Sequence, residues 1–405
     1  MKVVGVISGT SADAVDAALL EVLLPGDDPG GTGSSARDPR ASLVAYRELP
    51  FPQATRDRIL GASSSTVGTR ELAALRRELG EWFGTAVREL LGHAGVDPHE
   101  VAAVGSHGQT VWHEPPAASG AEAGTSLQLG DPSVVAAMSG IPVVSDFRSA
   151  DLAAGGEGAP LVPWPDQILF AREGQALAIQ NLGGIGNVTW LPPRGDPRDP
   201  VAFDTGPGNS LLDVAASMAT GGRAGFDRDG ALARSGRPDE GLLARLMEHR
   251  FFRLPPPRST GREVFGAALV ESLARERGLE PGRPEGWGDL VATLAAFTVE
   301  SVRVAYREWI VPLGADRVVL TGGGARNPVL AEGLRSALAP LPVETGAAAL
   351  GMDPDAREAA AFALLAWAFL HGRPGNVPAC TGASGPRVLG SWTPAPGRRE
   401  WWIQR

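Results

Sequence analysis

Hydrophobic and polar positions alternate along the chain with two periods, one typical of strands and one typical of helices. Residues 4–22 form two apolar stretches around a short turn of Gly, Thr, Ser and Asp, which predicts a hairpin. Residues 69–95 carry large apolar side chains at steps of three and four, which predicts a long amphipathic helix with those side chains in the core. Short strands are predicted at 101–105, 142–145, 201–203 and 317–320. This alternation of strands and helices favours an α/β fold.

The layout of the first hairpin recurs further along the chain. Residues 176–180 and 187–191 are predicted strands, and the turn 181–186 between them is rich in glycine. We therefore expect two related halves that face one nucleotide. Segments rich in Gly and Pro at 24–41, 115–125 and 153–165 predict loops. We expect one domain to span 1–142 together with 380–405, and a second to span 143–379.

Composition narrows the class of protein. A chain of 405 residues, 43% hydrophobic and 20% charged, is long enough for two globular domains. A net charge of −9 argues against a nucleic-acid partner, because no basic stripe is present to neutralise a phosphate backbone. The single cysteine, Cys380, permits no intrachain disulfide. The first residues lack the basic and apolar regions of a signal peptide, and no apolar run reaches about 18 to 20 residues, so we expect neither a secretory leader nor a membrane-spanning helix. We expect a cytoplasmic protein that acts on a small molecule, without a membrane partner.

The turn of the first hairpin has the composition of a phosphate-binding loop. Small residues let backbone N–H groups approach an anion, hydroxyls add donors, and carboxylates hold magnesium. Asp13 and Asp16 fit that metal-binding role. Taken alone, the same turn is equally well explained as an ordinary hairpin turn held by Asx and Ser/Thr hydrogen bonds.

Lysine is almost absent, which limits how phosphate can be bound. Lys2 is the only lysine, and neither the Walker A string nor the protein-kinase motifs occur. P-loop NTPases and protein kinases are therefore excluded. Phosphate charge must be neutralised by arginine, a metal ion and backbone N–H groups.

Three further strands end in polar or glycine-rich residues. The strand 101–105 leads into Ser-His-Gly-Gln-Thr, the strand 201–203 into Asp-Thr-Gly-Pro-Gly-Asn, and the strand 317–320 into Thr-Gly-Gly-Gly. Polar groups gathered at strand ends are typical of ligand sites in such sheets. Glycines let a base or ribose lie against the backbone, and a helix N-terminus favours a nearby phosphate. Each string alone is weak evidence, whereas the ordered set is far more specific.

These segments, taken together, resemble one known family over nearly the whole chain. The motifs that carry the resemblance are Ser8–Gly9–Thr10–Ser11–Ala12–Asp13, the nine residues 105–113 (GSHGQTVWH), Asp146–Phe147–Arg148, residues 158–161 (GAPL), residues 181–187 (NLGGIGN), residues 203–209 (FDTGPGN), residues 259–263 (STGRE) and the three glycines at 322–324. They resemble anhydro-N-acetylmuramic acid kinases.

The resemblance implies the actin-like ATPase fold, with two RNase H-like domains around a central cleft for nucleotide and substrate, usually assembled as a homodimer. The implied cofactors are ATP and Mg²⁺. In the implied reaction, ATP phosphorylates O6 of 1,6-anhydro-N-acetylmuramic acid while water attacks the anomeric carbon and opens the anhydro bridge. The products are N-acetylmuramic acid 6-phosphate and ADP. The implied role is in peptidoglycan recycling and amino-sugar metabolism.

The resemblance also implies roles for individual residues. Asp204 is the base that takes a proton from the attacking water. The first phosphate loop comprises Gly9, Thr10, Ser11, Ala12, Asp13, Ala14, Val15 and Asp16; the second comprises Gly183, Gly184 and Gly186; and the adenosine contact comprises Gly322, Gly323 and Gly324. The residues expected at the sugar are His107, Gln109, Asp146, Arg148 and Glu358. An alternative for Asp204 is that it caps the helix predicted from Ser210, although a cap is expected nearer Asn209.

The chain departs from the family pattern at two positions that bear on activity. Ala14 replaces a glycine, and Glu157 replaces a glutamine and adds negative charge. If position 14 needs a positive φ, the methyl group of Ala14 imposes strain. If position 14 instead opens the second strand, the alanine is harmless, and we favour this because an apolar run follows it. Arg258 replaces a lysine and keeps the charge.

Two other functions stay open at this point. An ordinary hexosamine or sugar-acid kinase on the same fold would use Asp204 to deprotonate a sugar hydroxyl and would consume no water. A non-catalytic, nucleotide-gated sugar sensor would account for Ala14 and Glu157, but the intact carboxylates argue against it.

Overall fold

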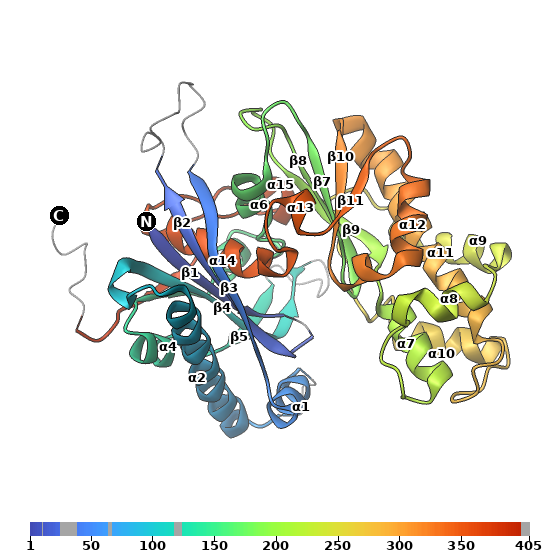
Figure 1. Cartoon of the computed structure of the whole chain (residues 1–405), viewed down its shortest axis with the longest axis horizontal. Helices are drawn as coiled ribbons and strands as arrows, with labels where there is room; N and C mark the ends of the chain where they lie inside the picture. Colours follow the sequence, from blue (N-terminus) through green and yellow to red (C-terminus); the bar gives the residue numbers. More distant parts are fainter. Residues whose placement is uncertain (10, 25–38, 64–66, 117–123, 398–405) are drawn as a thin grey trace. The chain divides into compact units, whose positions relative to one another are not determined.

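The computed structural model describes residues 1–9, 11–24, 39–63, 67–116 and 124–397 (Figure 1). The chain forms two compact units. The first contains Met1–Leu169 and Asp355–Arg405, and the second contains Phe170–Pro354.

The first unit is built on one mixed sheet whose strands run in the order β12-β6-β4-β1-β2-β3, with β5 paired to β4. Figure 1 labels β1 to β5 of this sheet. Its strands are β1 (Lys2–Ser8), β2 (Ala14–Leu23), β3 (Arg40–Pro50), β4 (Val101–Glu114), β5 (Thr125–Leu129), β6 (Val143–Ser145) and β12 (Ser391–Thr393). Its helices are α1 (Gln53–Ala62), α2 (Thr69–Ala94), α4 (Pro132–Ser139), α5 (Ser149–Leu152), α14 (Arg357–Leu370) and α15 (Pro378–Thr381), while α6 (Pro163–Phe170) ends at the boundary. The expected first hairpin and the long helix are confirmed as β1, β2 and α2.

The second unit repeats this topology. Its sheet has the order β11-β10-β7-β8-β9, with strands β7 (Leu177–Leu182), β8 (Ile185–Leu191), β9 (Val201–Pro207), β10 (Arg317–Thr321) and β11 (Val343–Thr345). In both units the first three strands pair antiparallel, and the first strand then pairs parallel with the fourth, which pairs parallel with the next. This strand order is that of the RNase H-like fold. The structure thus confirms two related α/β halves.

The bounds of the units differ from the domains expected at 1–142 with 380–405 and at 143–379. Strand β6 belongs to the first sheet because Val143 pairs with Val104 of β4 and with Thr393 of β12. Helix α14 belongs to the first unit as well, since it packs on β1, β2 and β4. Sequence periodicity did not reveal these pairings, because they join segments far apart along the chain.

Strand β4 also runs further than the sequence predicted. The expected strand 101–105 continues to Glu114, because β5 supplies an antiparallel partner for its second half, from Gln109 opposite Leu129 to Glu114 opposite Thr125. The motif that was expected to follow a strand end therefore lies within a strand.

The two faces of β1 are covered by different helices. Val4 and Val6 lie in one core cluster with Leu79 and Phe83 of α2. Gly5, between them, points to the opposite face, where α14 packs. A side chain there has no room, because a Cβ at Gly5 would lie 1.8 Å from the carbonyl oxygen of Ala359.

Gly105 of β4 makes the same close contact with α14. A Cβ at Gly105 would lie 2.1 Å from the carbonyl oxygen of Phe362. An ion pair between Arg357 and Asp166, buried on both sides, ties the first turn of α14 to α6. The backbone of α14 is thus seated directly on the sheet, and its N-terminal residues have a fixed position.

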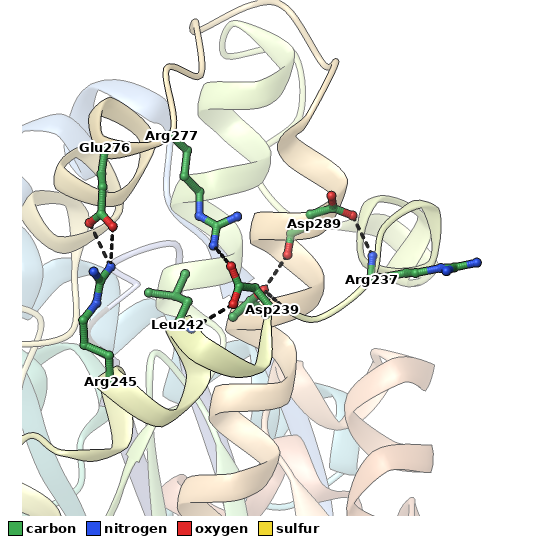
Figure 2. A network of polar contacts seen from close by, with 8 residues as sticks. Arg237, Asp239, Leu242, Arg245, Glu276, Arg277 and Asp289 are labelled. Atoms are coloured by element: carbon green, nitrogen blue, oxygen red, sulfur yellow. Dashed lines mark hydrogen bonds and ion pairs between the residues drawn. The ribbon is translucent and has the colours of Figure 1, made fainter.

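The helices of the second unit are α7 (Ser210–Thr220), α8 (Ala231–Ser235), α9 (Glu240–Met247), α10 (Ala267–Glu276), α11 (Trp287–Ala305), α12 (Pro328–Ala337) and α13 (Ala347–Leu350). Of these, α7, α8, α9 and α12 pack against α11, while α10 packs on α7 and α13 on β11. Figure 2 shows the polar contacts at one end of this group. Asp239 caps α9 by accepting from the N–H of Leu242 at 2.9 Å, pairs with Arg277 beyond α10, and donates its own N–H to Thr293 Oγ1 of α11 at 2.9 Å. One capping residue therefore links α9, the C-terminal end of α10 and α11 through hydrogen bonds.

None of the helices within the described ranges is both long and apolar enough to cross a membrane.

The contact at Gly105 predicts the stability of a variant. In Gly105→Ala, the added methyl must displace α14, and overpacking of this kind costs about 1–3 kcal/mol. The urea midpoint, followed by circular dichroism, should fall. The matched control is Gly92→Ala on the exposed face of α2, where nothing lies within 4 Å of the new Cβ; helix propensity should raise its stability by about 1 kcal/mol. A Gly105→Ala midpoint equal to wild type would refute the direct seating of α14.

Candidate active site

The turn between β1 and β2 is held by its own polar groups. Ser11 Oγ donates to Asp13 Oδ1 at 2.6 Å, and the N–H of Ala12 donates to the carbonyl of Gly9 at 3.1 Å. Thr10 lies outside the described residues. Ala14 is the first residue of β2 and pairs with Pro50, so the interpretation that position 14 opens the strand is confirmed. The turn residue with positive φ is instead Ala12, at 52°.

Asp16 lies in β2 among other carboxylates. Tyr46 of β3 donates its hydroxyl hydrogen to Asp16 Oδ1 at 2.5 Å. Burial raises the pKa of Asp16 to about 7, and the negative charges of Glu48, Glu358 and Asp13 act in the same direction. Val15 points the other way, into the core against α2. Among the described residues, no three metal-binding side chains gather around one point.

Gln109 joins β4 to the first turn. Its Oε1 accepts from Ser8 Oγ at 2.6 Å, and its Nε2 donates to the carbonyl of Gly9 at 3.2 Å. The side chain is buried, so its amide positions the turn.

His107 and Arg148, both expected at the sugar, contact each other. An Arg148 terminal nitrogen lies 2.9 Å from His107 Nε2, and the other terminal nitrogen donates to the carbonyl of Gly158 at 2.7 Å. Burial and the charge of Arg148 hold the pKa of His107 well below its usual value. Burial also lowers the pKa of Arg148 to about 10, opposed by the negative charges of Glu358 and Asp151.

Glu358, in the first turn of α14, interacts electrostatically with both Asp16 and Arg148. Asp146 is exposed, has a φ of 58° and accepts from Ser149 Oγ at 2.5 Å. The first unit therefore brings His107, Arg148, Glu358 and Asp16 into one neighbourhood.

In the second unit, the turn 183–184 is bonded to the start of α7. The N–H groups of Gly208 and Asn209 donate to the carbonyls of Gly184 and Gly183, at 3.0 and 2.8 Å. Because C=O and N–H point in opposite directions in a trans peptide, the N–H groups that follow these carbonyls point away from α7. A Cβ at Gly184 would lie 3.0 Å from the guanidinium of Arg262. The turn thus combines outward N–H groups with a nearby positive charge.

The segment Gly322 to Gly324 follows β10 and lies against the same turn. Gly322 has a φ of 78°, and a Cβ there would lie 2.4 Å from Asn181 Oδ1. A Cβ at Gly324 would lie 2.9 Å from the carbonyl oxygen of Leu182. The second unit therefore brings the 183–186 turn and the 322–324 segment together, and α12 follows with Asn327 as its cap.

Asp204 lies within β9 and is held by the loop 258–260. Its Oδ2 accepts from the N–H of Thr260 at 2.9 Å, and its backbone exchanges hydrogen bonds with Arg258. Burial raises the pKa of Asp204 to about 7, opposed by the hydrogen bond from Thr260 and the charge of Arg258. Helix α7 begins at Ser210 with Asn209 at its cap position, so Asp204 does not cap it.

Sequence reasoning assigned no role to some residues that complete these contacts. Thr260 belongs to the motif 259–263, to which no function was assigned, and Arg258 directly precedes that motif. The guanidinium of Arg258 lies over the rings of Phe203 and Phe251, 5.3 and 4.8 Å from their centroids. These contacts hold Arg258 in place, and its Nε donates to the backbone carbonyl of Asp204. No local sequence pattern indicated a role for Tyr46 or Asp151, because their hydrogen-bond partners are distant in sequence.

Comparison with known proteins identifies the family of the chain. A family model described as anhydro-N-acetylmuramic acid kinase matches residues 1–395. The chain is 44% identical over 393 residues to the anhydro-N-acetylmuramic acid kinase of Gloeobacter violaceus, covering 97% of this chain and 98% of the relative. It is 40% identical to the protein of that name from Caldanaerobacter subterraneus (96% of both chains) and 42% identical to that from Synechococcus elongatus (96% and 98%). The chain belongs to the anhydro-N-acetylmuramic acid kinase family.

Proposed function

We propose that this chain is the kinase that its family name describes. It transfers the γ-phosphoryl group of ATP to O6 of 1,6-anhydro-N-acetylmuramic acid and adds water across the anhydro bond. The products are N-acetylmuramic acid 6-phosphate and ADP, and the reaction serves peptidoglycan recycling and amino-sugar metabolism. Family membership over almost the whole length supports this function. The observation that carries the mechanism is the environment of Asp204.

Asp204 has the properties of a general base at neutral pH. A carboxylate with a pKa of about 7 is a stronger base than an ordinary one and is still substantially ionised at pH 7. Its Oδ2 is held by Thr260, whereas Oδ1 accepts no hydrogen bond from the described residues. The fixed oxygen orients the group, and the other oxygen is left to accept a proton from water.

In the proposed step, the oxygen of water bonds to the anomeric carbon while Asp204 takes the proton. The bond between the anomeric carbon and O6 breaks, and its electron pair stays on O6. O6 then bonds to the γ-phosphorus, and the bond from that phosphorus to the bridging oxygen breaks to release ADP. The proton on Asp204 returns to solvent. Atoms and charge balance without another reactant.

Nucleotide contacts are proposed in both units. The backbone of residues 9–16 and of Gly183, Gly184 and Gly186 would hold phosphates, and the glycines at 322–324 would lie against adenosine. The outward N–H groups of the second turn and the nearby guanidinium of Arg262 support this assignment. Arginine here supplies the positive charge that a chain with one lysine lacks.

Asp13 and Asp16 fit a magnesium ion. Mg²⁺ is commonly bound through one or two carboxylates, phosphate oxygens and waters, so a larger protein cluster is not required. Burial raises the pKa of Asp16, and the charges of Glu48, Glu358 and Asp13 add to this, so a cation bound there would favour the ionised carboxylate. When bound, the ion would neutralise charge on the phosphates.

The sugar contacts are proposed on the first unit. Arg148 is suited to the lactyl carboxylate, because its Nε is buried and has no hydrogen-bond partner among the described residues. Glu358 lies close enough to interact with it electrostatically, and Asp146 is exposed. Gln109 contributes by fixing the first turn.

The proposal includes a homodimer in the cytoplasm. Cys380 is buried and forms no disulfide, which is compatible with a reducing compartment that also supplies ATP. Light scattering of the purified chain measures the oligomeric state directly.

Asp204→Asn tests the catalytic base. The amide cannot accept the proton, so turnover should fall by about 10²–10⁴ while ATP binding and the fold persist. Isothermal titration with ATP and the melting temperature check those two points. Asp199→Asn, an exposed carboxylate in the same unit, is the matched control and should keep wild-type turnover. An Asp204→Asn variant that retains more than about a third of wild-type kcat would remove Asp204 from this role.

The raised pKa of Asp204 predicts the pH dependence. Below pH 7 the base is protonated, so kcat/KM should fall on the acid side with a midpoint near 7. The pKa of Asp204 is about 7 in the folded protein and 3.8 in an unperturbed carboxyl group. Between these two values the folded protein keeps the proton and the unfolded chain loses it, so the free energy of unfolding decreases as pH rises towards 7. The melting temperature of Asp204→Asn minus that of wild type should therefore be more positive at pH 8 than at pH 5. An acid limb near pH 4 and no pH-dependent stability difference would contradict the assigned environment.

Ala14→Gly tests whether the departure from the family pattern matters. Ala14 is a strand residue, so glycine should lower stability by about 0.5–1 kcal/mol and leave the KM values for ATP and sugar unchanged. In the control Ala12→Gly, relief of the positive φ offsets part of the loss, so stability should fall less. A clear fall in the KM for ATP in Ala14→Gly would show that the methyl group crowds the nucleotide.

A further inference from the structure

The guanidinium of Arg148 is held from two sides. One terminal nitrogen contacts His107 Nε2 of β4 at 2.9 Å, and the other donates to the carbonyl of Gly158 at 2.7 Å. Its Nε is buried without a hydrogen-bond partner among the described residues. A buried charged donor left unpaired is costly, so this N–H indicates a missing acceptor.

The hydrogen bonds of His107 fix its tautomer. A guanidinium only donates, so Nε2 must accept from Arg148. The carbonyl of Gly108 only accepts, and it lies 3.0 Å from Nδ1, so Nδ1 carries the proton. Both ring nitrogens are therefore engaged inside the protein, and the ring is neutral. No ring nitrogen is left to bind a sugar or transfer a proton.

Packing holds the ring of His107 in place. The side chain is 6% exposed, and its ring lies against that of Phe362 with centroids 4.4 Å apart. Phe362 belongs to α14 and also contacts Phe147, at 5.5 Å. Since α14 is seated directly on β1 and β4, the acceptor that His107 offers to Arg148 has little freedom to move.

The second support is fixed by a buried carboxylate. Asp151 is 0% exposed, and its Oδ2 accepts from the N–H of Gly158 at 2.9 Å. Its Oδ1 accepts from Asn376 Nδ2 and Thr381 Oγ1, both at 2.7 Å. The loop that presents the Gly158 carbonyl to Arg148 is thus tied to the C-terminal part of the first unit.

We propose that His107 and Asp151 are positioning residues that fix the guanidinium of Arg148 for a carboxylate of the substrate. His107 acts only through Arg148 and does not itself contact the sugar. This inference rests on the proposed function and deepens it: the substrate class that fits is an acidic sugar, whose carboxylate supplies the acceptor for the buried Nε–H. A neutral sugar would leave that donor unpaired.

A double-mutant cycle tests the inference. His107→Phe keeps the ring and its packing but removes the acceptor, and Arg148→Met keeps the stem but removes the donors. Because a hydrogen bond to a charged group is lost, Arg148→Met should raise the sugar KM by about 10-fold or more, with the KM for ATP unchanged. His107→Phe should raise the sugar KM in the wild-type background and have no further effect in the Arg148→Met background. Effects that multiply would show that His107 acts independently and would overturn the inference.

Two further variants keep the test decisive. His99→Phe, an exposed histidine in the same unit, is the matched control and should leave the sugar KM unchanged. His107→Gln retains an acceptor oxygen, so its sugar KM should stay within about threefold of wild type. A His107→Gln KM as high as that of Arg148→Met would overturn the inference even if His107→Phe failed to fold. Absence of turnover in the wild-type protein would instead refute the proposed function.

Discussion

The close contact of α14 with the first sheet is the constraint on which the candidate sugar site depends. Gly5 and Gly105 have no side chain, so the carbonyls of Ala359 and Phe362 lie where Cβ atoms would otherwise be. This contact fixes Glu358 at the start of the helix and Phe362 one turn later. Phe362 in turn supports the ring of His107, and His107 supports Arg148. The geometry of the polar groups thus follows from a backbone contact that only glycine permits.

Both candidate sites contain buried ionisable groups whose pKa values are shifted from their usual values. In the first unit, burial and neighbouring carboxylates raise the pKa of Asp16, whereas burial lowers the pKa of Arg148 against the opposing charges of Glu358 and Asp151. In the second unit, burial raises the pKa of Asp204, while Thr260 and Arg258 keep the shift moderate. Positions where the fold disfavours the charged form are typical of functional sites. A ligand that supplies the opposite charge or an acceptor stabilises these groups.

Local patterns predicted much of the fold. The two hairpins and the long helix α2 follow from apolar periodicity and turn composition, and the repeated hairpin predicted two related halves. The length of β4 and the place of β6 and α14 were missed, because they depend on partners such as β5 and β12 that lie far along the chain. The geometry of a single residue was predicted in one case: Ala14 is the first residue of a strand, as the apolar run that follows it indicated.

The site was predicted less completely than the fold. Family motifs named His107 and Arg148 but gave no reason to expect that one holds the other. Asp151 and Tyr46 went unnoticed, since each acquires its role only through long-range hydrogen bonds. Motifs indicate which residues matter, whereas tertiary contacts decide which of them touch a ligand and which position another side chain.

In the proposed reaction, water enters the product while ATP is consumed. Incubation of the protein with ATP, magnesium and 1,6-anhydro-N-acetylmuramic acid in oxygen-18 water, followed by mass spectrometry, measures this directly. We expect one oxygen-18 atom at the anomeric hydroxyl of N-acetylmuramic acid 6-phosphate and none in the phosphate. A phosphorylated product that still carries the anhydro ring, or label in the phosphate, would contradict it.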